Sequence, residues 1–195
     1  MTTIDSLALA QLFDEARTFS RWQEREVPDG LIENALKLAM LGPTSGNCEP
    51  MRVVLAKSPE AKERLLRCVS SGNSDKVRTA PVTAIVAYDT LFYEHLPRLF
   101  PHTDARSWFT SNEALATETA FRNSSLQGAY FILALRAHGL DCGPMSGFNP
   151  KAVDETFFPD TRYRVNFLLN IGYGNRAALH PRPPRLDFAE MASWA

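Results

Sequence analysis

Residues 139–149, with the sequence GLDCGPMSGFN, combine three glycines and a proline within nine positions. Such a composition permits close approach of the backbone to a ligand and unusual dihedral angles. The segment contains almost no ionisable side chain. We therefore expect it to present main-chain N–H groups to a flat, electron-rich group rather than to supply an acid, a base or a metal ligand. Composition alone favours the alternative, a helix C-cap followed by a surface loop.

Several kinds of site are not indicated by the sequence. It has neither a Gly-x-Gly-x-x-Gly motif after a strand nor a Gly-x-x-x-x-Gly-Lys-Ser/Thr motif, so a stably held dinucleotide or triphosphate is not predicted. His95, His102, His138 and Asp104 lack metal-ligand spacing, and we predict no metal site. Cys142 could be reactive, but a small buried thiol is the favoured interpretation.

The bulk properties narrow the class of protein further. We expect one domain over residues 1–195, and the net charge of −1 gives no general attraction to nucleic acid or anionic membranes. No apolar run approaches the roughly 20 residues that span a bilayer. The N-terminus carries acids where a signal peptide would carry bases, and three widely spaced cysteines argue against a disulfide framework. These features predict a cytoplasmic protein with no nucleic-acid or membrane partner.

Hydrophobic periodicity predicts the elements that must position these residues. The continuous apolar run at 81–88 is typical of a strand buried on both faces. The longest helical pattern, over 112–138, carries small residues that would let a neighbour approach closely. Further helices are predicted over 6–16, 29–41 and 59–69, and further strands over 51–56 and 165–171.

Two segments do not fit a regular pattern. Residues 89–111 are aromatic and contain prolines, and the tail from Asn175 is too proline-rich for regular structure and long enough to reach over a partner subunit. The order of elements predicts an α+β fold with a small mixed sheet flanked by helices and an extended C-terminal arm.

Four segments together resemble the FMN-dependent nitroreductase family. Residues 16–22 (ARTFSRW) are similar to its Arg-x-Ser-x-Arg/Lys-x-aromatic phosphate-binding signature, and residues 43–50 (PTSGNCEP) to its Pro-Ser-Ser-x-Asn-x-Gln-Pro loop. Residues 72–76 (GNSDK) resemble its Asn-x-x-Lys element, and residues 139–148 its Gly-Leu-x-x-x-Pro-x-x-Gly-Phe segment. The resemblance covers nearly the whole chain and implies a nitroreductase-like fold with tightly bound FMN.

The resemblance implies an arginine site for the FMN phosphate, because a planar guanidinium can hold two phosphate oxygens at once. A solvated helix end is the alternative interpretation of Arg17 and Arg21. Ala16 and Ser20 stand where relatives often carry further basic residues, so either phosphate affinity is reduced or Arg21 and Arg182 compensate. The residues assigned to the phosphate are Arg17, Thr18, Arg182 and Arg185.

The resemblance also implies contacts to the isoalloxazine ring. A cation at Lys76 near N1 and O2 would favour the reduced flavin, although a surface lysine is the alternative. Main-chain N–H groups of the Pro144–Gly147 turn would face N5, and the 44–47 residues would come from a partner subunit. The residues assigned to the ring are Thr44, Ser45, Asn47, Asn73, Lys76, Asn123, Pro144, Met145, Ser146 and Gly147.

Residues 92–110 are expected to form a lid over the flavin, the alternative being a long surface loop with a local aromatic cluster. Tyr93 and His102 are candidate proton donors to a carbonyl acceptor. An arginine of the lid would hold the carboxylate of a small acidic aldehyde. The residues assigned to the substrate are His102, Arg106, Trp108 and Phe109.

The resemblance implies an NAD(P)H oxidoreductase in which FMN, rather than a catalytic side chain, carries the chemistry and NADH or NADPH is a transient donor. It also implies a homodimer with its sites at the interface. The runs FPHTDARSWFTS, ETAFRNSSLQ and GPMSGF resemble the compact subgroup of the Rut-pathway malonic semialdehyde reductase of pyrimidine degradation. One alternative is a generalist nitro, quinone or enal reductase. The other is a non-catalytic flavin-binding dimer.

Overall fold

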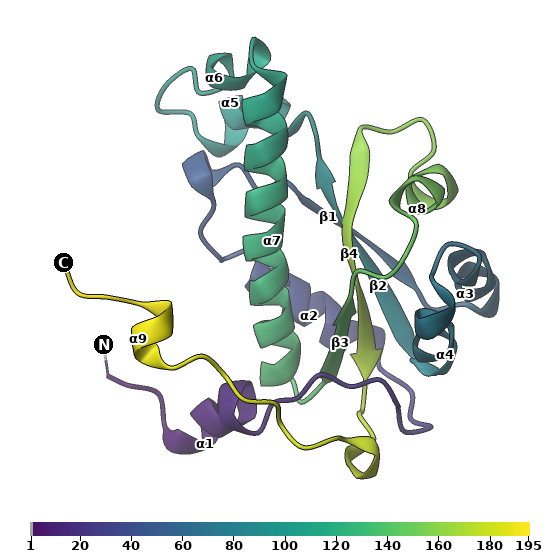
Figure 1. Cartoon of the computed structure of the whole chain (residues 1–195). Coiled ribbons are helices and arrows are strands. Elements are labelled where there is room, and N and C mark those ends of the chain that lie inside the picture. Colours follow the sequence, from purple (N-terminus) through teal and green to yellow (C-terminus); the bar gives the residue numbers. More distant parts are fainter. Residues whose placement is uncertain (1) are drawn as a thin grey trace.

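The computed structural model describes residues 2–195 and is built around a four-stranded sheet (Figure 1). The strands lie in the order β1-β2-β4-β3, and all the neighbouring pairs are antiparallel. We predicted a mixed sheet, but parallel pairing within residues 2–195 is limited to a bridge between Thr18 and Cys142. The strands are β1 (Met51–Ala56), β2 (Val82–Asp89), β3 (Asp141–Met145) and β4 (Tyr163–Gly172).

Helices cover both faces of the sheet (Figure 1). The long helix α7 and helix α2 pack against each other on one face, and three shorter helices cover the other. This sandwich of two helical layers around a small antiparallel sheet confirms the α+β prediction. The helices are α2 (Asp29–Ala39), α3 (Pro59–Leu66), α4 (Ser71–Thr79), α7 (Glu113–Ala137) and α8 (Pro150–Phe157).

Strand β2 lies inside the sheet and is buried on both faces, as its apolar sequence predicts. Ala84 and Val86 belong to the hydrophobic cluster that contains Phe131 of α7. Ile85, which points to the opposite face, belongs to the cluster that contains Leu65 of α3. Because side chains alternate along a strand, one apolar run supplies the core of both layers.

Local sequence fixes both ends of α7. Asn112 Oδ1 accepts a hydrogen bond from Leu115 N at 3.0 Å and so caps the first turn. The helix ends before Gly139, whose φ of +75° is a conformation that glycine adopts readily. Within the helix, a Cβ at Gly128 would lie 2.6 Å from the Phe167 ring. The predicted close approach of a neighbouring element to a small residue of α7 is therefore confirmed at Gly128.

Residues 139–149 are only partly a turn. We predicted a turn throughout, which was wrong for Asp141–Met145, because these residues pair with β4 as the edge strand β3. An edge strand accommodates Pro144, whose ring nitrogen cannot donate a hydrogen bond. Phe19 N donates to Cys142 O at 3.0 Å, so the N-terminal segment covers the beginning of this edge.

Other elements differ in extent from the prediction. The first helix consists of α1 (Ser6–Leu9) followed by a π-helical turn over Ala10–Asp14. Helices α4 and α8 were missed. Helix α4 has few apolar residues and buries only Asn73 and Val77. Short helices also occur in segments predicted to be irregular, namely Phe92–His95, α5 (Leu96–Leu99), α6 (Ser107–Thr110), Arg176–Ala178 and α9 (Phe188–Met191).

Helix length alone does not make a membrane span in this fold. Helix α7 has 25 residues, but charged side chains such as Glu118 and Arg122 interrupt its sequence. Within residues 2–195, no helix combines the length and the apolar character needed to cross a bilayer.

We predict that Gly143→Ala lowers the free energy of unfolding by about 1–3 kcal/mol, the usual cost of overpacking. A Cβ at this position would lie 2.3 Å from the carbonyl oxygen of Phe19, which backbone pairing holds in place. Gly30→Ala is the matched control, because Gly30 has open space around it and lies in α2. Denaturant unfolding of both variants checks the prediction, and equal stabilities would contradict it.

Candidate functional site

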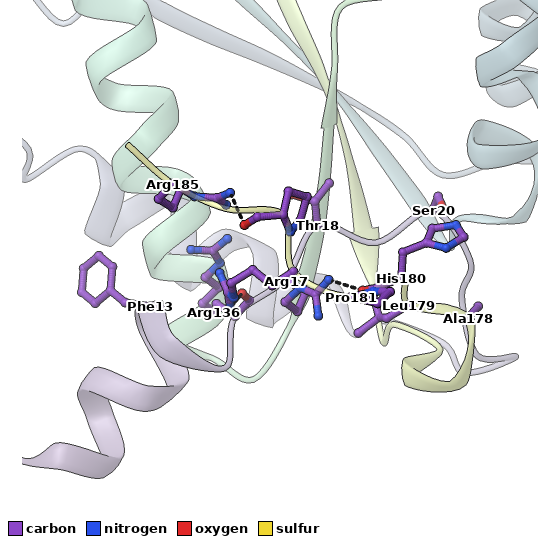
Figure 2. Close-up of a pocket in the computed structure, with 13 residues that line it drawn as sticks. Phe13, Arg17, Thr18, Ser20, Arg136, Ala178, Leu179, His180, Pro181 and Arg185 are labelled. Atoms are coloured by element: carbon purple, nitrogen blue, oxygen red, sulfur yellow. Dashed lines mark hydrogen bonds between the residues drawn. The ribbon is translucent and has the colours of Figure 1, made fainter. Parts of the chain in front are cut away.

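A cavity of about 470 Å³ opens between the N-terminal segment, the end of α7 and the C-terminal tail (Figure 2). Arginines from three parts of the chain line it: Arg17, Arg136, Arg182 and Arg185. The hydroxyl residues Thr18 and Ser20 add possible donors, and His180 lies at the same cavity. No Asp or Glu within residues 2–195 contributes to its lining. The cavity is therefore strongly positive.

Neutral carbonyls, not carboxylates, accept the hydrogen bonds of these arginines. Arg17 Nη2 donates to His180 O at 2.6 Å, which fastens the tail to the N-terminal segment. Arg182 Nη2 donates to the carbonyl oxygens of Asp14 and Ala16 at 2.6 and 2.8 Å. These contacts hold the guanidinium groups in place and leave their charges uncompensated. Such a group of arginines fits a phosphate dianion.

The C-terminal tail makes its contacts with its own chain. We expected the proline-rich tail to reach a partner's site, but Arg182 binds residues 14–16 of the same chain, and Arg185 Nη1 donates to the carbonyl oxygens of Pro183 and Pro184 at 3.2 Å. The contacts are local or with the first segment because the tail crosses the end of α7 (Figure 1). Arg17, Thr18, Arg182 and Arg185 are thus brought together within one subunit.

Strand β3 connects this cavity with a second group of predicted site residues. Thr18 pairs with Cys142 at one end of β3, and Gly147 follows its other end. Pro144 and Ser146 are exposed along this path, while Met145 and Gly147 are half-buried. A ligand whose anionic end occupies the arginine cavity could therefore extend along the exposed edge of β3.

Gly147 is held tightly by two side chains. Its carbonyl oxygen accepts hydrogen bonds from Ser70 N at 3.0 Å, Ser70 Oγ at 2.9 Å and Asn73 Nδ2 at 2.9 Å. A Cβ on Gly147 would lie 2.4 Å from Asn73 Nδ2, so any larger residue would push Asn73 away. The pair Asn73–Gly147 therefore needs glycine for its close approach.

A chain of hydrogen bonds positions Lys76 beside Asn73. Lys76 Nζ donates to Asn73 Oδ1 at 2.8 Å. The Lys76 carbonyl accepts from Asn170 Nδ2 at 3.1 Å, and Asn170 Oδ1 accepts from Thr83 Oγ1 at 2.6 Å. Asn73 therefore orients the ammonium group, and Asn170 of β4 holds the backbone of α4 at Lys76. Asn73, Lys76 and Gly147 form one connected group, as the resemblance implies.

Asn123 belongs to a different group from the one we predicted. Its Oδ1 accepts a hydrogen bond from Ser45 N at 2.8 Å, and its Nδ2 donates to Thr119 O at 2.8 Å. Asn47 Nδ2 donates to Leu99 O at 2.9 Å, and Thr44 Oγ1 accepts from the nearby Glu49 N at 3.3 Å. Asn123 therefore fixes the 44–47 loop of its own chain, and α7 places it on the opposite face of the sheet from α4 (Figure 1).

The predicted lid is packed rather than open. Phe109 is buried, with its ring centroid 4.9 Å from Phe92 and 6.3 Å from Tyr93, so in this chain it serves as a core residue. Arg106 donates to both carboxylate oxygens of Glu94 at 2.8 Å and lowers the pKa of that carboxyl group. The charge of Arg106 is therefore already compensated.

Two other predicted lid residues remain exposed. Trp108 packs beside Phe100 with ring centroids 6.1 Å apart, and it would lie 3.7 Å from a Cβ on Gly46. His102 contacts Phe100 edge-on at 5.5 Å. Trp108 thus stands next to the 44–47 loop, whereas His102, Arg106 and Phe109 make their contacts within the lid.

The arginine cavity and the 44–47 loop meet different parts of α7. Asn123 and Arg136 lie thirteen residues apart on this helix, which is about 20 Å along its axis. The loop and the lid are near the first half of the helix, and the arginine cavity is at its end (Figure 1). One chain therefore does not bring Thr44, Ser45 and Asn47 to the arginine cavity.

Sequence reasoning missed three residues of this arrangement. Ser70 and Asn170 hold Gly147 and Lys76, but a single serine or asparagine beside a strand or helix carries no recognisable signal. Arg136 lies in the last turn of α7, where a cation commonly interacts with the helix dipole. Only the three-dimensional structure places it at the cavity.

Comparison with known proteins identifies the family. The nitroreductase family matches residues 16–173. This chain belongs to the nitroreductase family. A protein of Burkholderia lata provisionally named NADH dehydrogenase/NAD(P)H nitroreductase is 58% identical over 192 residues, which is 98% of each chain. A similarly named protein of Ralstonia nicotianae is 52% identical over 97% of each chain. The chain is accordingly an oxidoreductase.

Solved structures agree on the fold. A nitroreductase-like structure from Bacillus subtilis superposes with a TM-score of 0.88 at 20% identity, covering 98% of this chain and 100% of that one. One from Exiguobacterium sibiricum, solved in complex with FMN, has a TM-score of 0.86 at 22% identity, covering 100% and 99% of the two chains. The nitroreductase-like fold predicted from the sequence is confirmed.

All three cysteines, Cys48, Cys68 and Cys142, are buried. Burial raises the pKa of Cys48 to about 11 and that of Cys142 to about 12. Since the thiolate is the reactive form, both thiols are protonated at pH 8 and would ionise only well above that pH. Within residues 2–195, no group of His, Cys, Asp and Glu side chains is arranged to hold a metal ion.

We predict that an aromatic disulfide reagent at pH 8 leaves Cys48 and Cys142 unmodified in the native protein over minutes. Both should react quickly after denaturation, which removes burial and returns each pKa to its ordinary range. Mass spectrometry of the labelled protein identifies the modified residue. Rapid native labelling of Cys142 would contradict its assignment as a buried, unreactive thiol.

Proposed function

We propose that this member of the nitroreductase family is an FMN-dependent NAD(P)H oxidoreductase whose arginine cavity binds the FMN phosphate. The observation that carries the proposal is a cavity lined by four arginines and, within residues 2–195, by no acid. The FMN complex of the Exiguobacterium sibiricum structure supports the choice of cofactor. When bound, FMN would take a hydride from NADH or NADPH and pass it to a small acceptor.

The residues around Gly147 would bind and orient the ring in this proposal. Pro144 and Ser146, which are exposed, would lie along the ring edge, with the half-buried Met145 and Gly147 beside it. The absence of a side chain at Gly147 lets Asn73 approach the turn closely. Lys76, held by Asn73 at 2.8 Å, would place a positive charge at the pyrimidine edge and so favour the reduced cofactor. No catalytic side chain is required.

We further propose a homodimer in which the 44–47 loop completes the partner's site. Thr44, Ser45 and Asn47 lie about 20 Å along α7 from the arginine cavity of their own chain, so a second copy would have to supply them. An apolar patch formed by Met40, Leu41, Leu126 and Tyr130 supports this assembly, because each of its side chains is exposed in the single chain. Large exposed apolar patches commonly mark subunit interfaces.

For the acceptor we propose malonic semialdehyde, reduced to 3-hydroxypropanoate in pyrimidine degradation by a cytoplasmic enzyme. The support is the subgroup resemblance of the lid sequence. Arg106 is paired with Glu94, so Arg98, which forms no ion pair within residues 2–195, is the lid arginine available for the substrate carboxylate. His102 and Trp108 are exposed, and Trp108 lies beside Gly46 of the 44–47 loop.

The second candidate function is a generalist nitro or quinone reductase. It is favoured by the nitroreductase names of relatives that are 52–58% identical to this chain. The predicted proton donors Tyr93 and His102 belong to the lid segment and not to the Gly147 group, and a carbonyl acceptor needs such a donor more than a nitro group does.

We predict that the purified protein, supplied with FMN, is yellow and loses its flavin absorbance anaerobically when NADH or NADPH is added. Stopped-flow absorbance measures the rate for each nucleotide. A sample that retains FMN but is bleached by neither nucleotide would contradict the oxidoreductase proposal and support a non-catalytic flavin-binding dimer.

A second mixing step distinguishes the acceptors. We predict that the reduced protein is reoxidised faster by malonic semialdehyde than by a nitroaromatic at equal concentration. We also predict that Arg98→Gln selectively slows the semialdehyde reaction, because it raises the semialdehyde concentration needed for the half-maximal rate. Arg106→Gln is the matched control, because Glu94 already engages that side chain. Faster reoxidation by the nitroaromatic would favour the generalist reductase.

A further inference from the structure

We infer that Arg136, which comes from the end of α7, is a direct ligand of the flavin phosphate and supplies the charge that positions 16 and 20 lack. The inference rests on the proposed function and deepens it. Ala16 and Ser20 line the same cavity but contribute no positive charge there. Among residues 2–195, Arg136 is the one basic residue that lines the cavity from the helical layer rather than from the first segment or the tail.

Arg136 has few partners within the protein. Its Nη1 donates to Leu12 O at 2.9 Å, and within residues 2–195 its guanidinium forms no ion pair. Nε is buried and has no hydrogen-bond partner in the described chain. A half-buried guanidinium with an unsatisfied donor and no counterion is costly, so the chain would gain from an anion beside it.

The position of Arg136 is fixed from both sides. Gln11 Nε2 donates to the Arg136 carbonyl at 2.6 Å, and Arg136 in turn donates to Leu12, so the π-helical turn and the end of α7 hold each other. Arg136, Arg17 and Arg185 all line the cavity, and Figure 2 shows Arg185 above the other two in that view. An oxyanion in this space could be approached by guanidinium groups from three separate segments.

The charge of Arg136 matters because the other three arginines of the cavity are partly engaged. Arg17, Arg182 and Arg185 each use part of their hydrogen-bonding capacity on carbonyl oxygens. A phosphate dianion has three terminal oxygens to satisfy, and several charge-assisted donors are needed to replace the water it loses. Arg136 adds a fourth charge, which comes from helix α7 rather than from the first segment or the tail.

The alternative is that Arg136 only fastens the N-terminal turn to α7. The two roles differ in how they affect flavins with and without a phosphate. A ligand of the phosphate contributes to the binding of FMN but not of riboflavin, which lacks that group. A structural residue would affect both flavins equally and would also lower the thermal stability of the protein without ligand.

The experiment is a fluorescence titration of the whole protein with FMN and with riboflavin, using Arg136→Gln and Arg136→Lys. We expect Arg136→Gln to weaken FMN binding by about 10- to 100-fold, the usual effect of losing a charged hydrogen bond, and to leave riboflavin binding unchanged. Arg136→Lys should retain part of the FMN affinity, because it keeps the charge but loses the planar fork. Arg21→Gln is the control, since Arg21 is exposed and does not line the cavity.

Two results would overturn the inference while leaving the proposed function intact. In the first, Arg136→Gln binds FMN as tightly as the unchanged protein does. In the second, Arg136→Gln loses affinity for FMN and for riboflavin by the same factor. If the unsubstituted protein binds riboflavin and FMN with the same affinity, both the inference about Arg136 and the proposed phosphate site are overturned. Thermal unfolding without ligand, measured on each variant, identifies any loss that comes from disturbed folding.

Discussion

The backbone hydrogen bond from Phe19 N to Cys142 O joins the first segment of the chain to the edge strand of the sheet. Because Thr18 pairs with Cys142, the adjacent Arg17 must lie at the beginning of β3. The same pairing leaves so little room that Gly143 cannot carry a side chain. Once Arg17 is held there, its bond to His180 brings the tail across the end of α7, and the arginine cavity closes around segments far apart in sequence.

Grouping several arginines without a carboxylate works against folding, since like charges repel one another. The chain limits this cost by giving the guanidinium groups carbonyl acceptors, as at Asp14 and His180, and by leaving the cavity open to solvent. Asp89 shows the opposite solution elsewhere in the fold: this buried carboxylate is satisfied by Arg52 and Arg162 at 2.8–3.0 Å. The cavity arginines have no such partner within residues 2–195, which is why they are suited to a ligand rather than to stability.

Much of this arrangement could be predicted from local sequence. The apolar run of β2 and the extent of α7 follow from residue types and their periodicity. Asn73 and Gly147 were singled out by the family resemblance, and the structure connects them through a hydrogen bond. The roles of these residues toward a flavin remain predictions. The family resemblance also singled out Arg17 and Arg185, although not that one subunit brings them together.

The rest depends on pairings between distant segments. Residues 141–145 have the composition of a turn, and only their register with β4 makes them a strand. Arg136 has the local appearance of an ordinary helix-end cation, and its place at the cavity follows from the crossing of α7 by the tail. Asn123 lies on the correct helix but faces the 44–47 loop, because the sheet separates α7 from α4. Hydrophobic periodicity indicates where helices and strands occur. A site built from several of these elements can be located only when their packing is known.

The most direct test of the account is a crystal structure of the protein with FMN. We expect the phosphate oxygens to lie within about 2.7–2.9 Å of guanidinium nitrogens of Arg17 and Arg136, with the ring along β3 toward Gly147. The 44–47 loop beside that ring should belong to a second subunit. A phosphate bound outside the arginine cavity would contradict the central claim.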